Sequence, residues 1–252
     1  MSLIIIPPRQ ITLREAASFV GTTPETIREY HETGLLPEPA RGSTDGQYTY
    51  TDMVRLLWIT TMADAGIAMD DIRGAFVDAA PAGATGDYAS VPGRVGLLSE
   101  LVRTRLTRLP DESLYQADLD ALLITEHMSG PLAATVQGSR FIALATRPEL
   151  RQECDRLDSA EKALDDSVAV DDPRVAQVAQ DRHVFEKSLN AFCTESGLVQ
   201  EEDAVFDSWY EANRNGDDKP TSAADRRGKM PYDFSPAALR SMELSFELEE
   251  NE

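Results

Sequence analysis

Two short helix patterns lie three residues apart near the start of the chain, and they constrain its fold more than any other feature. Thr12 begins the first pattern with a capping box, and Gly21 ends it. Thr23 and Pro24 begin the second, because proline at the first helical position has no N–H to leave unpaired. Gly34 suits the left-handed conformation that terminates a helix. Two short helices joined by a tight turn containing glycine predict a helix-turn-helix.

The segment that follows predicts a hairpin and two more helices. In residues 41–50, the Asp45-Gly46 pair is a turn signal, and alternating Tyr and Thr residues favour a strand. A third helix is expected over about 52–65 and a fourth over about 69–78. Core packing is the expected role of the apolar stripe on the third helix, which consists of Val54, Leu57, Trp58 and Met62.

These residues resemble the DNA-binding domain of a known family in type and order. Residues 23–37 (TPETIREYHETGLLP) resemble the recognition helix and exit of the mercury-resistance-regulator (MerR) family of transcription factors. The resemblance continues through residues 46–50 (GQYTY) and the helix that contains Arg55. Residues 65–72 (AGIAMDDI) are similar to the second wing of the family. The resemblance covers residues 10–77 and stops near residue 78.

The resemblance implies a mostly α-helical protein with an N-terminal winged helix-turn-helix and a small β-hairpin wing. It also implies dimerisation through an antiparallel coiled coil after the winged domain. The sequence beyond residue 78 itself predicts a linker, a coiled-coil-like helix and a C-terminal helical domain. The function implied is that of a bacterial transcriptional regulator, a homodimer that binds a pseudo-palindromic promoter operator. In this family the activated dimer bends and untwists the DNA, which lets RNA polymerase use the promoter. Double-stranded DNA and a second copy are thus the expected partners, and RNA polymerase is affected indirectly.

The start of the second helix is the expected DNA contact on physical grounds as well. A helix N-terminus offers free N–H groups and a positive dipole end to a phosphate. The hydroxyls of Thr23 and Thr26 can add phosphate contacts, and Arg28 can reach a base edge. Core packing is the alternative for Tyr30, and a solvated loop charge is the alternative for Arg41. The expected DNA-binding residues are Thr12, Arg14, Thr23, Thr26, Arg28, Tyr30, Arg41 and Tyr48.

Two residues depart from the family pattern, and both remove positive potential. Glu29 follows the recognition-helix arginine where the family often has an aromatic residue, and Tyr48 stands where the wing usually carries arginine. A carboxylate near phosphates weakens binding unless it accepts from a cytosine amino group or pairs with Arg28. The alternative function is therefore a protein-interaction module that keeps the winged fold with weak or no DNA binding.

A long helical stretch at about 94–128 follows a linker, residues 80–93, that is rich in Ala, Gly and Pro. Its apolar seam is the expected dimerisation surface, and Pro110 predicts a kink or break. Ordinary helices in the core of the effector domain are the alternative. The seam consists of Val95, Leu98, Leu101, Val102, Leu106, Leu109, Leu119, Leu122 and Leu123.

Residues 131–252 predict further helices but resemble no known family. The expected domains are therefore 1–78 (DNA binding), 79–130 (linker and dimerisation helix) and 131–252 (effector or interaction domain). Aromatic rings and carboxylates together can hold a cationic small molecule. An effector site is thus expected at Phe185, Phe192, Phe206, Trp209 and Tyr210. The hydrophobic core of a helical bundle is the alternative role for these rings, and a regulator without a ligand also stays open.

Charge and cysteine content narrow the function further. The chain has 252 residues and a formal net charge of −20, which opposes non-specific binding to nucleic acid. Residues 1–77 contain six arginines and no lysine, so DNA binding must depend on a few oriented groups. Cys154 and Cys193 fit a reducing cytosol and are expected to be buried structural cysteines.

The sequence contains no catalytic, metal-binding or membrane-spanning motif. The sequence has no nucleophile–base constellation and no phosphate-binding loop, so we expect no enzymatic activity. Two distant cysteines without a histidine neighbour predict no metal site, and we expect no cofactor. No apolar run reaches the ~18–20 residues of a membrane helix. The expected location is cytoplasmic.

Overall fold

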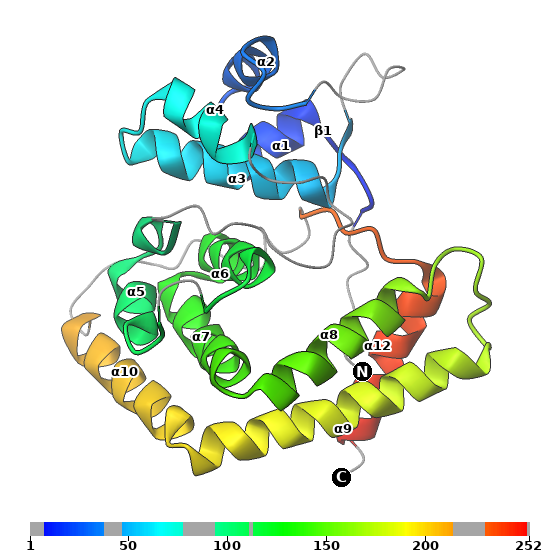
Figure 1. Cartoon of the computed structure of the whole chain (residues 1–252). Coiled ribbons are helices and arrows are strands. Elements are labelled where there is room, and N and C mark those ends of the chain that lie inside the picture. The colour runs from blue at the N-terminus through cyan, green and yellow to red at the C-terminus, as the bar shows by residue number, and fades with distance from the viewer. Residues whose placement is uncertain (1–7, 38–46, 78–93, 111–112, 214–229, 251–252) are drawn as a thin grey trace. The chain divides into compact units, whose positions relative to one another are not determined.

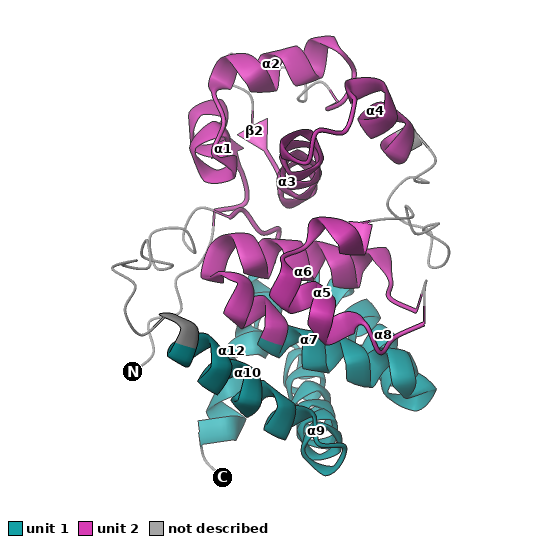
Figure 2. Cartoon of the chain, turned by 90° about the vertical axis from the view of Figure 1, so that its left-hand side faces the viewer, with its two compact units in different colours: residues 1–4, 136–217, 234–252 teal, residues 5–135, 218–233 magenta. Residues whose placement is uncertain are grey.

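Helices make up most of the described chain, as the local sequence signals predict. The computed structural model describes residues 8–37, 47–77, 94–110, 113–213 and 230–250. Two compact units are distinguished (Figure 2). Unit 2 consists of residues 5–135 and 218–233, and unit 1 consists of residues 1–4, 136–217 and 234–252.

Unit 2 begins with the predicted helix-turn-helix (Figure 1). Helix α1 spans Leu13–Val20 and helix α2 spans Pro24–Glu32. The capping box at the start of α1 is confirmed, because the Thr12 hydroxyl accepts from the Glu15 N–H and the Glu15 carboxylate accepts from the Thr12 N–H. Gly21 adopts a left-handed conformation with φ 76° and ends α1, as predicted.

The small sheet of unit 2 is formed by two strands that lie far apart in sequence. Strand β1 (Ile11–Thr12) pairs antiparallel with strand β2 (Gln47–Tyr48), with Ile11 opposite Tyr48. The hairpin predicted over residues 41–50 lies partly outside the described residues. Its described end therefore pairs with the strand before α1, which anchors β2 to the helix-turn-helix.

Helices α3 (Tyr50–Asp64) and α4 (Met69–Val77) complete the N-terminal part of unit 2. The apolar stripe predicted for the third helix is buried, and α3 packs against both α1 and α4. Core residues from all four helices have exposures of 2% or less; they include Ala16, Ile27, Leu57, Trp58 and Ile72.

The helical stretch predicted over 94–128 is broken near Pro110, as predicted, and its described residues form three helices. They are the 3₁₀-helix η1 (Arg94–Leu97), α5 (Glu100–Leu106) and α6 (Gln116–Ser129). The break surrounds Pro110, which cannot donate a backbone hydrogen bond. Most of the predicted dimerisation seam is buried within the chain itself: Leu98, Val102, Leu106, Leu119, Leu122 and Leu123 are at most 6% exposed. These six residues therefore form part of the core of unit 2, and not of the effector domain that the alternative named.

A polar contact joins α3 to α6 within unit 2. The Trp58 indole N–H donates to the Asp120 carboxylate over 2.6 Å, and the Gln116 amide donates to the same oxygen. Partial burial raises the pKa of Asp120 above its ordinary value, although both hydrogen bonds oppose that shift. The Arg94 guanidinium lies 4.9 Å from the centre of the Trp58 ring.

Residues 230–233 return to unit 2 from the far end of the sequence. The Tyr232 N–H donates to the Pro8 carbonyl over 2.9 Å, and the Tyr232 ring lies 5.0 Å from that of Tyr50. Arg9 and Asp233 form an ion pair of 3.6 Å. No local signal in the sequence indicates where this segment packs.

Unit 1 is a bundle of helices that contains most of α7 (Pro131–Thr146). Its other helices among the described residues are α8 (Pro148–Lys162), α9 (Pro173–Glu195), α10 (Leu198–Asn213) and α12 (Pro236–Glu250). Helix α12 lies along α9 (Figure 1). A buried cluster between them contains Leu164, Val168, Val175, Val178 and Ala237. No helix among the described residues is both long and apolar enough to cross a membrane.

Candidate nucleic-acid interface

Helix α2 turns one face into the core and the other outward. Ile27 and Tyr30 are buried, at 0% and 6% exposure. The outward face is made of four charged and exposed side chains, Glu25, Arg28, Glu29 and Glu32. Three carboxylates therefore accompany the single arginine of this helix. Any approach to phosphate must overcome their repulsion.

The N-terminus of α2 is already capped by the chain itself. Thr23 is the N-cap residue, and its hydroxyl accepts from the Thr26 N–H over 3.1 Å. The two hydroxyls lie 3.0 Å apart, so one donates to the other and the second O–H points elsewhere. Pro24 has no N–H to offer. The hydroxyls, rather than free backbone amides, are thus the polar groups that this helix end presents.

Arg28 is exposed but paired. Its guanidinium lies 3.2 Å from the Glu25 carboxylate, with side-chain exposures of 57% and 74%. The backbone N–H of Glu25 and the Arg28 guanidinium together hold the pKa of the Glu25 carboxyl below its ordinary value. An exposed pair of this kind contributes little to stability. Arg28 can therefore exchange this carboxylate for a phosphate or a guanine edge at small cost.

Two more of the expected DNA-binding residues lie at the start of α1: Thr12 is its N-cap and Arg14 is in its first turn. Arg14 is exposed and has no ion-pair partner among the residues that the structure describes. Thr12 is exposed, but its hydroxyl both accepts from the Glu15 N–H and donates to the Glu15 carboxylate. Arg14 therefore stays available for a phosphate, whereas Thr12 is used by the capping box.

We expected Tyr48 to be exposed near the tip of the wing, but it is buried. It is 2% exposed, and its hydroxyl lies 2.9 Å from Nε2 of His31. Burial raises the pKa of Tyr48 to about 12. Successive side chains of a strand point to opposite faces, so Tyr48 points inward while its neighbour Gln47 faces solvent. Burial also raises the pKa of Tyr30, in keeping with the core alternative for that residue. Arg41 lies outside the described residues.

The carboxyl end of α2 carries two contacts that the sequence analysis missed. The Arg55 Nε–H of α3 donates to the Leu35 carbonyl over 2.6 Å. The Arg73 Nε–H of α4 donates to the Thr33 carbonyl over 3.0 Å. Both arginines are among the six of residues 1–77, but neither is one of the expected DNA-binding residues. Only the alternation of helices and loops in three dimensions brings them to this helix end.

Two short helices joined by the turn at Gly21 and supported by α3 define a helix-turn-helix domain, the class of fold that places its second helix in the DNA major groove. Residues 11–77 match the model of the family described as MerR HTH family regulatory protein, so the N-terminal domain is of the MerR type. This match supports a DNA-binding transcriptional regulator. Residues 78–252 lie outside the match, and no curated protein and no solved structure matches the chain.

The five aromatic residues expected to bind an effector have different surroundings in unit 1. Phe185 is buried, and the guanidinium groups of Arg140 and Arg182 lie 5.5 and 5.7 Å from its ring centre. Arg147 lies 4.9 Å from the ring centre of Phe192. Arginines of the chain itself thus occupy ring faces that a cationic ligand would need.

The other three residues lie on α10. Phe206 is partly buried, whereas Trp209 and Tyr210 are 36% and 62% exposed. The last two rings pack edge to face at 5.3 Å. They form an exposed pair on one helix rather than the wall of an enclosed cage.

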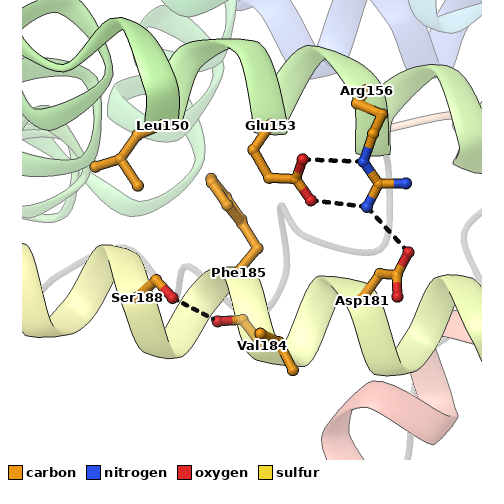
Figure 3. A pocket seen from close by; sticks show the side chains of 7 residues that line it. All are labelled: Leu150, Glu153, Arg156, Asp181, Val184, Phe185 and Ser188. Atoms are coloured by element: carbon orange, nitrogen blue, oxygen red, sulfur yellow. Dashed lines mark hydrogen bonds and ion pairs between the residues drawn. The ribbon is translucent and has the colours of Figure 1, made fainter.

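A small pocket of about 270 Å³ lies between α8 and α9 (Figure 3). Phe185 is the one predicted effector residue that lines it. Arg156 bridges Glu153 and Asp181 at 2.7 and 2.9 Å, so its charge is already compensated. The pocket is lined by Leu150, Glu153, Arg156, Asp181, Val184, Phe185 and Ser188. Its volume is slightly below the range of about 300–1,000 Å³ that is usual for small-molecule sites.

Neither cysteine forms a disulfide, and both are buried. Burial raises the pKa of the Cys154 thiol, which disfavours the thiolate that a metal would bind. The described residues contain no group of three or more His, Cys, Asp or Glu side chains that could hold a metal ion.

Proposed function

We propose that this protein regulates transcription by binding a promoter operator through α2, with Arg28 reading the DNA and Thr23 and Thr26 contacting phosphate. The observation that carries the proposal is the exposed Arg28 on the second helix of a domain that matches the MerR family. Arg14 of α1 supplies a further phosphate contact, because it is exposed on the helix that precedes the turn.

The charge of α2 makes this binding selective. Glu25, Glu29 and Glu32 repel phosphates wherever the contacts of Arg28 are not made. Specific DNA compensates this repulsion by base contacts, whereas random DNA does not. We therefore expect salt-sensitive, site-specific binding with poor affinity for random sequence.

Fluorescence anisotropy with the DNA upstream of the protein's own gene, measured over a series of salt concentrations, tests this proposal. Arg28→Ala is expected to weaken binding about 10–100-fold and to relax specificity at one position of the site. Arg174→Ala, in α9 of unit 1, removes an ion-paired arginine of similar side-chain exposure, 61% against 57%, and should leave the affinity unchanged. The absence of specific binding at low salt would overturn the proposal.

A protein-interaction module is the second candidate function, and the ion pair between Arg28 and Glu25 favours it. This pair and the two other glutamates leave the outward face of α2 with a net negative charge. In that case the same assay would show no binding above the level of random DNA, for the unmodified protein and for Arg28→Ala alike.

The finer points of the proposal come from the family resemblance. They are a homodimer, a pseudo-palindromic operator, distortion of the promoter DNA and indirect control of RNA polymerase. Most of the seam expected to join the dimer is core in unit 2, so the dimer contact must lie outside that buried seam. Light scattering in solution should give the mass of two chains of 27.7 kDa each, and a single-chain mass would contradict the dimer.

Effector control in unit 1 is also part of the proposal. Of the five aromatic residues expected to bind the effector, Phe185 lines a pocket, and we propose that the effector binds there. A titration with small aromatic dyes, followed through ligand fluorescence, should show saturable binding that Val184→Arg abolishes by filling the pocket. Non-saturable binding that the substitution leaves unchanged would remove effector control from the proposal.

A further inference from the structure

The carbonyl groups at the carboxyl end of α2 have partners from two different sources. The Thr33 N–H donates to the Glu29 carbonyl, and the Gly34 N–H donates to that of His31. The Leu36 N–H closes the turn on the Tyr30 carbonyl over 3.0 Å. The Thr33 carbonyl instead accepts from the guanidinium of Arg73, and the Leu35 carbonyl accepts from that of Arg55.

Each of the two arginines arrives from a different helix. Arg55 belongs to α3, and its guanidinium also lies 4.5 Å from the ring centre of Phe76 in α4. Arg73 belongs to α4, and a 2.6 Å ion pair with Asp70 directs its guanidinium. The end of α2 is thus tied to both helices that support it. A cation at this end is also favourable, because the carboxyl end of a helix dipole is negative.

Arg94, which follows the linker in sequence, packs against the same Phe76 ring as Arg55. The Arg94 guanidinium lies 5.3 Å from the same Phe76 ring and 4.9 Å from the ring of Trp58. Arg94 is buried and Arg55 is half-buried, and this burial lowers the pKa of both guanidinium groups. Arg55 therefore lies within a packed stack of unit 2 and is not directed at a ligand in solvent.

We propose that Arg55 and Arg73 are positioning residues, which set the direction of the recognition helix by holding the carbonyls of Thr33 and Leu35, in the cap and turn that directly follow it. This inference rests on the proposed function, because the direction of α2 matters most when Arg28 must meet DNA. Of the arginines described in the helix-turn-helix domain, Arg14 and Arg28 then contact DNA, while Arg55 and Arg73 act through α2.

The test uses the full-length protein with Arg55→Met, Arg73→Met and, as the matched control, Arg14→Met. Methionine keeps a long apolar stem and removes the N–H donors. Hydrogen exchange without DNA is the first measurement. The amides of Thr33, Gly34 and Leu36 should exchange about tenfold faster in Arg55→Met and Arg73→Met, and at the unmodified rate in Arg14→Met.

Operator binding over a salt series is the second measurement. Arg55→Met and Arg73→Met should weaken binding about tenfold and leave the log–log salt slope unchanged, because neither removes a phosphate contact. Arg14→Met should reduce the slope by about one. Arg73→Lys should recover part of the affinity, since an ammonium group can also donate to the Thr33 carbonyl.

Two results would overturn the inference. One is unchanged exchange at the end of α2 in both variants. The other is a salt slope reduced by about one in Arg55→Met or Arg73→Met, which would make that arginine a direct phosphate contact. If the unmodified protein binds no operator at all, the proposed function fails, and the exchange rates still decide whether the two arginines position α2.

Discussion

At the scale of single residues, hydrogen-bond partners decide what a polar side chain can do. Thr12, Thr23 and Asp172 each accept a backbone N–H as an N-cap, so their sequence position explains their role. Tyr48 is different, because its partner His31 is distant in sequence and its environment is buried. Local caps follow from sequence, whereas the surroundings of a tyrosine on a short strand do not.

Asp172 provides a prediction about pH. It caps α9, and its carboxylate accepts from both the side chain and the backbone N–H of Arg174, which lowers its pKa from 3.8 to about 2. A folded-state pKa below the unfolded value means that the stabilisation is present above about pH 4. It is lost as the pH falls towards 2.

Asp172→Asn keeps a capping acceptor and removes this titration. In urea unfolding at several pH values, the unmodified protein should be more stable than the variant above pH 4. The difference should shrink as the pH approaches 2. Asp171→Asn controls for the loss of one charge in the same segment. A difference that does not vary with pH would contradict the prediction.

At the scale of elements, the two ends of α2 separate what the local sequence predicts from what it does not. The Thr23 cap, the Pro24 start and the left-handed glycine at position 34 were all predicted from sequence, and the structure confirms them. The tie between the end of α2 and helices α3 and α4 was not predicted. It depends on where Arg55 and Arg73 arrive after two further helices have folded.

Gly34→Ala should lower the free energy of unfolding by about 1–2 kcal/mol, because an L-residue is strained in the left-handed region. Gly34 has φ 73°, and nothing lies within 4 Å of an added Cβ, so the cost comes from the backbone alone. Gly74→Ala in α4 is the matched control. It also meets no atom, and it should stabilise the helix by about 0.4–1 kcal/mol. Equal effects from both substitutions in urea unfolding would refute this reason.

At the scale of the whole molecule, the two compact units differ in how far sequence explains them. Unit 2 contains the family match, and its helices after the linker pack on α3 through Trp58 and Asp120. Unit 1 has no match, and ion pairs join α9 to other helices; Arg182 of α9 is paired with Asp158 and Glu161 of α8. The apolar seam of residues 94–128 belongs to the core of unit 2.

Leu122→Ala distinguishes a core leucine from a dimer contact. Leu122 is 0% exposed, so its truncation should cost about 2–5 kcal/mol of stability in urea unfolding. The mass from light scattering should equal that of the unmodified protein. Val95→Ala, at a 36% exposed position of the same predicted seam, should change stability by less than about 0.5 kcal/mol. A folded Leu122→Ala variant with half the mass would show that the seam joins two chains.

The fold class and the domain that approaches DNA were predictable because their signals are local. Capping residues, glycines and apolar spacing act within one or two turns of a helix, and the order of helices then matches the family. The helices predicted for the C-terminal part begin at residue 148, so α7 was missed, since its apolar residues show little helical periodicity. The effector residues stay a prediction, because similar aromatic spacing serves both a core and a pocket.

The sequence by itself determined the short helices, their caps and turns, and the MerR-type domain that they form. The reason is that each of these depends on residues a few positions apart. Only the tertiary structure decided that Tyr48 is buried, that most of the 94–128 seam is core, and that Arg55 and Arg73 hold the end of α2. These outcomes depend on contacts between distant segments, whose free energy is gained only when the helices pack together.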